Sequence, residues 1–70
     1  MPLPAEVLNE IKNRIDEAED SIRNVEDVIS DLRATGVDAS KQEEKLAEVK
    51  EELRRLRLFY ERQHGKLSSA

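Results

Sequence analysis

The stretch "LNEIKNRIDEAEDSIRNVEDVISDL", residues 8–32, decides the fold class of this 70-residue chain. Its apolar residues are separated alternately by three and four positions over more than three heptads, which is the spacing of a coiled-coil seam. The pattern predicts a long helix that buries a narrow apolar stripe against another helix. The stripe consists of Leu8, Ile11, Ile15, Ala18, Ile22, Val25, Ile29 and Leu32.

The same spacing resumes after the segment "ATGVDAS", residues 34–40. The second stripe consists of Leu46, Val49, Leu53, Leu56 and Tyr60, and Ala39 and Gln42 extend it backwards in the same phase. The chain is therefore predicted to be one all-α helical-hairpin domain over residues 1–70. We expect helix 1 over about 4–35, a turn at 36–38, helix 2 over about 39–64 and a frayed tail at 65–70.

Residues that start and end helices agree with these bounds. Pro4 suits a first helical turn, where a missing N–H is harmless, and Gly36 suits the left-handed residue that closes a helix. Gly65 is predicted to end helix 2. Either Asp38 or Ser40 is suited to cap the start of helix 2, and the sequence does not decide between the two.

A connection of about five residues predicts that the two helices run antiparallel as neighbours. Seam residues whose numbers sum to 74 or 75 are then predicted to face each other. Each layer, from Leu32 with Gln42 to Ile15 with Tyr60, thereby contains one seam residue from each helix. On one flank of the seam, the facing residues are opposite in charge. These predicted pairs are Arg33 with Glu43, Glu26 with Lys50, and Glu19 with Arg57.

One such hairpin buries too little apolar surface to offset the entropy of ordering its chain, so we expect self-association, with a homodimeric four-helix bundle as the usual solution. Apolar residues widen the seam on its other flank, at Val7, Val28 and Phe59. Leu58 faces further outward than Phe59. The candidate oligomer or partner interface therefore comprises Val7, Val28, Leu58 and Phe59.

A cluster of basic residues follows in helix 2, at Arg54, Arg55, Arg57, Arg62 and Lys66. Such a patch beside an aromatic residue is one way to bind nucleic-acid phosphates. The net charge of −4 and the pI near 5.0 disfavour this interpretation. In the antiparallel fold, the acidic residues from Asp16 to Asp20 would also lie beside these arginines and neutralise them.

Motifs for catalysis or metal binding are weak. Glu61 and His64 have the E-x-x-H spacing of some metal sites in helical bundles, but both fall on the outside of the predicted hairpin. There is no cysteine, no glycine-rich phosphate loop and no serine or lysine with an activating partner. We therefore expect no enzymatic activity, no catalytic residue, no cofactor and no metal. No apolar run approaches a membrane span, and the start "MPLPAEVL" lacks the features of a signal peptide, which suggests a cytoplasmic location.

These observations predict a non-enzymatic protein–protein interaction module, acting as an adaptor, a regulator or an assembly subunit. It would act through the helix faces of a self-associating hairpin, with a possible heterologous protein partner. A nucleic-acid-binding hairpin dimer that uses the basic residues 54–66 is the alternative. A second alternative is a designed or excised coiled-coil segment without a binding role.

Overall fold

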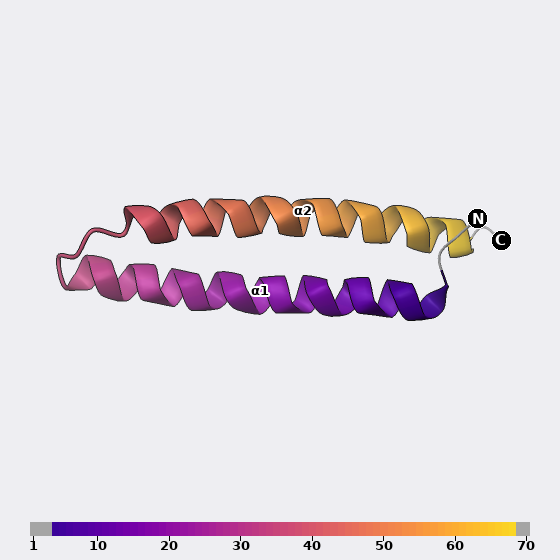
Figure 1. Ribbon diagram of the computed structural model, residues 1–70, viewed down its shortest axis with the longest axis horizontal. Helices are drawn as coiled ribbons and strands as arrows, with labels where there is room; N and C mark the ends of the chain where they lie inside the picture. The colour runs from indigo at the N-terminus through magenta and orange to yellow at the C-terminus, as the bar shows by residue number, and fades with distance from the viewer. Residues whose placement is uncertain (1–3, 69–70) are drawn as a thin grey trace.

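The computed structural model describes residues 4–68, with the side chains of residues 4–66. Two helices make up this part of the chain, α1 at Ala5–Ala34 and α2 at Ser40–Ser68. They lie side by side and antiparallel, so the start of α1 and the end of α2 lie at the same end of the molecule (Figure 1). The prediction of an all-α helical hairpin is confirmed.

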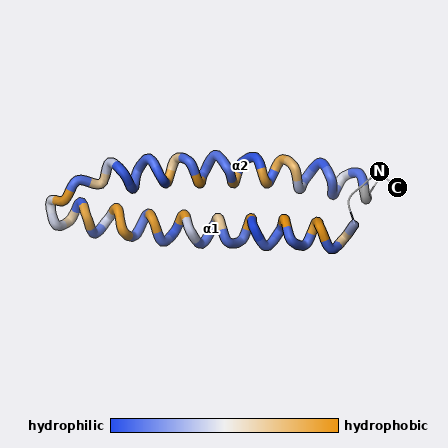
Figure 2. The backbone as a smooth tube through the Cα atoms, viewed as in Figure 1, coloured by the Kyte–Doolittle hydropathy of each residue, from blue (hydrophilic) through white to orange (hydrophobic). Residues whose placement is uncertain are grey.

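The hairpin is long and narrow, with extents of 54 × 15 × 13 Å and a radius of gyration of 16.0 Å. A compact domain of this length would have a radius of gyration of about 11 Å. The apolar segments of each helix are turned toward the other helix, and the outer sides are hydrophilic (Figure 2). A single seam between two helices is therefore the whole core of the described chain.

The turn begins with a Schellman motif at the end of α1. The Val37 N–H donates to the Leu32 carbonyl at 2.8 Å, and the Gly36 N–H donates to the Arg33 carbonyl at 3.1 Å. Gly36 has φ +75°, the left-handed conformation that this motif requires and that glycine adopts without strain. These bonds satisfy carbonyl groups that the last turn of α1 leaves without partners, so the chain reverses directly after the helix.

The start of α2 is capped by Asp38. Its carboxylate accepts hydrogen bonds from the Ser40 N–H at 3.1 Å and from the Ser40 hydroxyl at 2.6 Å. Both hydrogen bonds lower the pKa of Asp38, and the bond from the Ser40 hydroxyl has the larger effect. Of the two capping residues that the sequence allowed, Asp38 is thus the one that accepts from the helix backbone.

The end of α2 differs from the prediction. We expected Gly65 to end the helix, but α2 continues through Gly65 to Ser68. Gly65 has no positive φ, and a Cβ at this position would meet nothing within 4 Å. A glycine ends a helix only where the chain turns into the left-handed region, and here nothing forces that turn. Of the predicted tail 65–70, residues 69 and 70 lie outside the described residues.

Candidate interaction surfaces

Every predicted seam residue is buried or half-buried. The buried ones are Leu8, Ile15, Ile29 and Leu53, together with Ala39 at the turn end. The other seam residues are half-buried: Ile11, Ala18, Ile22, Val25, Leu32, Leu46, Val49, Leu56 and Tyr60. Among the residues described, none has less than 2% of its surface exposed, so the seam remains partly open to solvent along its length.

One polar residue in the seam lacks a hydrogen-bond partner. The Oε1 atom of Gln63 is buried and accepts no hydrogen bond from the described chain. Gln63 follows Tyr60 in the apolar seam, near the open end of the hairpin. Burying an amide oxygen without a partner is unfavourable, so this layer weakens the open end of the hairpin.

Charged residues on one flank of the seam connect the two helices. The flank is lined by Lys12, Glu19, Glu26 and Arg33 of α1 and Glu43, Lys50, Arg57 and His64 of α2; we call it the e flank. Arg57 donates to Glu19 at 3.2 Å, and Arg33 donates to Glu43. The described structure has no ion pair between Glu26 and Lys50, the third predicted pair. The two observed pairs are exposed and of small energetic value, but they are two of the three pairs predicted from the sequence.

The opposite flank carries the predicted interface. It is formed by Val7, Arg14, Ser21, Val28 and Thr35 of α1 and Lys45, Glu52, Phe59 and Lys66 of α2; we call it the g flank. Val28 is 48% exposed and Phe59 is 41% exposed, whereas Val7 is half-buried. Leu58, 47% exposed, directly precedes Phe59 in α2 and points about 100° away from it around the helix. The structure thus separates Leu58 from the other three candidates.

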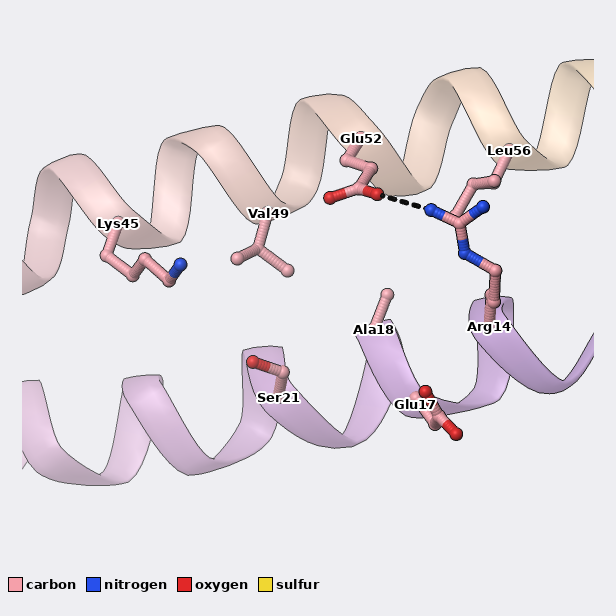
Figure 3. Close-up of a pocket in the computed structure, with 8 residues that line it drawn as sticks. All are labelled: Arg14, Glu17, Ala18, Ser21, Lys45, Val49, Glu52 and Leu56. Atoms are coloured by element: carbon pink, nitrogen blue, oxygen red, sulfur yellow. Dashed lines mark hydrogen bonds and ion pairs between the residues drawn. The ribbon is translucent and has the colours of Figure 1, made fainter. Parts of the chain in front are cut away.

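A groove of about 260 Å³ opens in the middle of the g flank. It is lined by Arg14, Glu17, Ala18, Ser21, Lys45, Val49, Glu52 and Leu56 (Figure 3); we call it the central groove. Ala18 and Ser21 have the smallest side chains in this part of α1, and they leave space below the facing helix. Arg14 donates to Glu52 at 3.1 Å across the groove (Figure 3).

The central groove was not predicted from the sequence. Its signal was present in the two small residues three positions apart, Ala18 in the seam and Ser21 beside it, which share one face of α1. The Arg14–Glu52 pair was missed as well, because the predicted register puts Phe59 level with Arg14, whereas the structure places Leu56 across from it (Figure 3).

The predicted basic patch is partly neutralised by two neighbouring carboxylates. Arg54 and Arg55 pair with Glu51 at 2.7 Å and 3.5 Å, and Arg57 pairs with Glu19. The hydrogen bond from Arg54 lowers the pKa of Glu51, and the positive charge of Arg54 adds a smaller lowering. The hydrogen bond to Glu51 and its negative charge likewise raise the pKa of Arg54. Arg62 and Lys66 are exposed further along α2. The carboxylates of Glu51 and Glu19 thus offset part of the positive charge that a phosphate backbone would meet at this patch.

Glu61 and His64, the E-x-x-H pair, are both exposed on α2. His64 stacks on Tyr60, with ring centroids 5.7 Å apart and an angle of 27° between the planes. Over the described residues, no group of three or more acidic, histidine or cysteine side chains converges as a metal site would require. Neither helix, over residues 4–68, has an apolar stretch long enough to cross a bilayer.

Comparison with known proteins adds no further constraint. No protein-family model matches the chain, no curated protein is detectably similar to it, and no solved structure matches it. The function is therefore argued from the surfaces of the hairpin.

Proposed function

We propose that this chain is a non-enzymatic protein–protein interaction module that works as a self-associating hairpin. Two copies would pack as a homodimeric four-helix bundle. The bundle would then present its outer helix faces to other proteins as an adaptor, a regulator or an assembly subunit. The observation that carries the proposal is the incomplete burial of the seam.

The accessible surface of the single hairpin supports self-association. It amounts to 5406 Å², against about 4,450 Å² for a folded monomeric protein of 8.0 kDa. The excess of about 950 Å² is close to the ~800 Å² that each partner contributes to a specific interface of standard size. Packing one hairpin against another would thus bring the exposed surface of each chain into the normal range.

The position of the exposed apolar side chains supports the g flank as the contact surface. Val28 and Phe59 project there beside the half-buried seam residues Val49 and Leu56. An apolar strip that continues an open seam is what a second helical layer covers in a four-helix bundle. The e flank has no apolar side chain, and two cross-helix ion pairs span it, against one on the g flank.

The proposal is tested by a pair of neighbouring substitutions. Phe59→Glu places a charge in the proposed contact, and Leu58→Glu places the same charge one residue away, on a side chain of similar exposure. Light scattering after size exclusion should show the wild type and Leu58→Glu as dimers and Phe59→Glu as a monomer. Far-UV circular dichroism would report whether each variant remains helical.

A Phe59→Glu variant that associates like the wild type would refute the g-flank contact, and so would equal dissociation of both variants. If Phe59→Glu fails to fold, the wild type alone still gives a test. The midpoint of thermal unfolding rises with protein concentration for a dimer and is constant for a monomer. A constant midpoint over a hundredfold range would overturn the proposal.

A further inference from the structure

We propose that the hairpin opens as a clamp, with its two helices parting at one end while the turn stays closed. The end that parts is the open end, where the start of α1 and the end of α2 lie together (Figure 1). This inference concerns a motion within one hairpin and goes beyond the proposed self-association. It follows from the unequal contacts at the two ends and from the buried amide of Gln63.

The turn end is held by contacts of several kinds. The Schellman motif and the Asp38 cap close the chain reversal with hydrogen bonds to the backbone. Arg33 donates to Glu43 across the two helices. In the seam at this end, Ile29 is 6% exposed and Ala39 is 5% exposed. Parting the helices here would break these contacts together, so the turn end opens only when the whole hairpin unfolds.

The open end lacks such contacts. Within the described chain, no ion pair or side-chain hydrogen bond joins residues 5–13 of α1 to residues 58–65 of α2. The start of α1 has no side-chain cap, because Pro4 occupies the cap position. Gly65 lies within α2, and the freedom that glycine gains in an unfolded segment favours loss of the helix there. The two segments therefore face each other without a polar contact between them.

Gln63 makes closure of the open end unfavourable. Its Oε1 atom is buried and accepts no hydrogen bond from the described chain. When the helices part, water reaches this oxygen and donates to it, so the open state regains the hydrogen bond that the closed state lacks. Gln42 lies three heptads earlier in the same stripe and is half-buried, but it has no buried oxygen without a partner. Of these two glutamines, only the one at the open end thus favours separation.

Opening uncovers apolar side chains that the closed hairpin covers. Leu8 is 4% exposed in the closed state, and Ile11 and Tyr60 are half-buried. Next to them in the sequence lie Val7 and Phe59 of the g flank. If the proposed self-association is correct, a second copy bound over Phe59 favours the closed state, and association and closure then support each other.

Residue-resolved amide hydrogen exchange of the wild-type chain, followed by NMR, tests the clamp. A helix without tertiary packing is only marginally stable, so amides at the parted end lose their hydrogen bonds and exchange. We expect the amides of residues 9–13 and 58–62 to be protected about tenfold less than those of residues 46–50. Because the two helices part together, the two open-end segments should also have similar protection factors.

Gln63→Leu distinguishes a clamp from simple fraying of α2. The substitution stabilises the closed state, so exchange should slow about fivefold, or by about 1 kcal/mol at 1.36 kcal/mol per factor of ten. The same slowing is expected at residues 9–13, although the substitution lies on the other helix. Slowing that is confined to α2 would overturn the clamp, because the two helices would then open separately.

Gly36→Ala is the matched change at the turn end. Its strain at positive φ is relieved only when the turn itself opens. The clamp predicts exchange about fivefold faster at residues 46–50 and unchanged at residues 9–13 and 58–62. Equal acceleration in all three segments would overturn the proposal, because the hairpin would then open only as a whole. If Gly36→Ala fails to fold, Asp38→Ala, which removes the cap of α2, provides the same comparison.

The outcomes separate this inference from the proposed function. A chain that sediments as a monomer and shows the predicted exchange pattern would overturn self-association and leave the clamp standing. A dimer in which all three segments respond equally to Gly36→Ala would overturn the clamp and leave self-association standing.

Discussion

Leu53→Ala should be among the most destabilising single substitutions in the seam. Leu53 is 6% exposed and lies in the middle of the seam. The change removes three carbon atoms from this layer, worth about 2.4 kcal/mol at ~0.8 kcal/mol each. Because the seam is open at its sides, the Leu53→Ala substitution leaves no sealed cavity, and the added penalty of a buried cavity is small.

We therefore expect the free energy of unfolding to fall by about 2 to 3 kcal/mol per chain, measured by urea unfolding followed by far-UV circular dichroism. For a domain of this size, the melting temperature would fall by about 10 to 20 °C. Leu58→Ala is the matched control, because the same atoms are removed from a side chain that is 47% exposed. It should change the free energy of unfolding by less than about 0.5 kcal/mol. Equal losses in the two variants would refute the assignment of the core to this seam.

Four further changes test the turn and the open end of the hairpin. Gly36→Ala should lower the free energy of unfolding by about 1 kcal/mol, because alanine is strained at the positive φ of this position. Gly65→Ala should raise the free energy of unfolding by about 0.5 kcal/mol, because Gly65 lies inside α2. Changes of the same sign for both variants in thermal unfolding would contradict the observed end of α2. Gln63→Leu should raise the free energy of unfolding by about 1 kcal/mol in urea unfolding, because a buried oxygen without a partner is replaced by an apolar group in the seam. The contribution of Asp38, whose pKa is lowered by folding, should be complete above the unfolded pKa of about 3.9 and be lost as the pH falls through the folded pKa. In unfolding measured against pH, Asp38→Asn should keep the cap but lose this dependence, and an unchanged profile would show that another group causes it.

The sequence predicted the hairpin because two independent signals agreed. The heptad spacing placed the seam residues on one stripe of each helix, and the short segment around Gly36 left room only for a reversal of the chain. In the structure, the chain reverses through the positive φ of Gly36, and the Val37 and Gly36 N–H groups donate hydrogen bonds back to α1. Opposite charges at Arg33 and Glu43 then indicated the register.

The end of α2 was predicted wrongly because a glycine can either end a helix or lie within one. Gly36 and Gly65 are the same residue type, but only Gly36 precedes a segment that must change direction. Gly65 has no positive φ and stays in the helix at a modest entropic disadvantage. The sequence signal for a helix end was local, whereas the conformation of Gly65 depends on whether the chain beyond it must reverse.

The central groove could not be derived from pairing rules alone. Layer matching assigns Ala18 to Leu56 and treats the layer as filled, although a methyl group occupies far less space than the side chains of neighbouring layers. The space appears only when Ser21 is placed beside Ala18 on the same flank. Arg14 reaches Glu52 across that space, because no bulky side chain lies between them (Figure 3).

Sedimentation equilibrium of the wild-type chain over a wide concentration range tests the central claim most directly. Incomplete burial of the seam and the excess exposed surface predict a mass of twice the 8.0 kDa chain at micromolar concentrations. Phe59→Glu, measured in parallel, should sediment with the mass of one chain. A wild-type chain that is helical, unfolds cooperatively and sediments at 8.0 kDa throughout would contradict the proposed self-association.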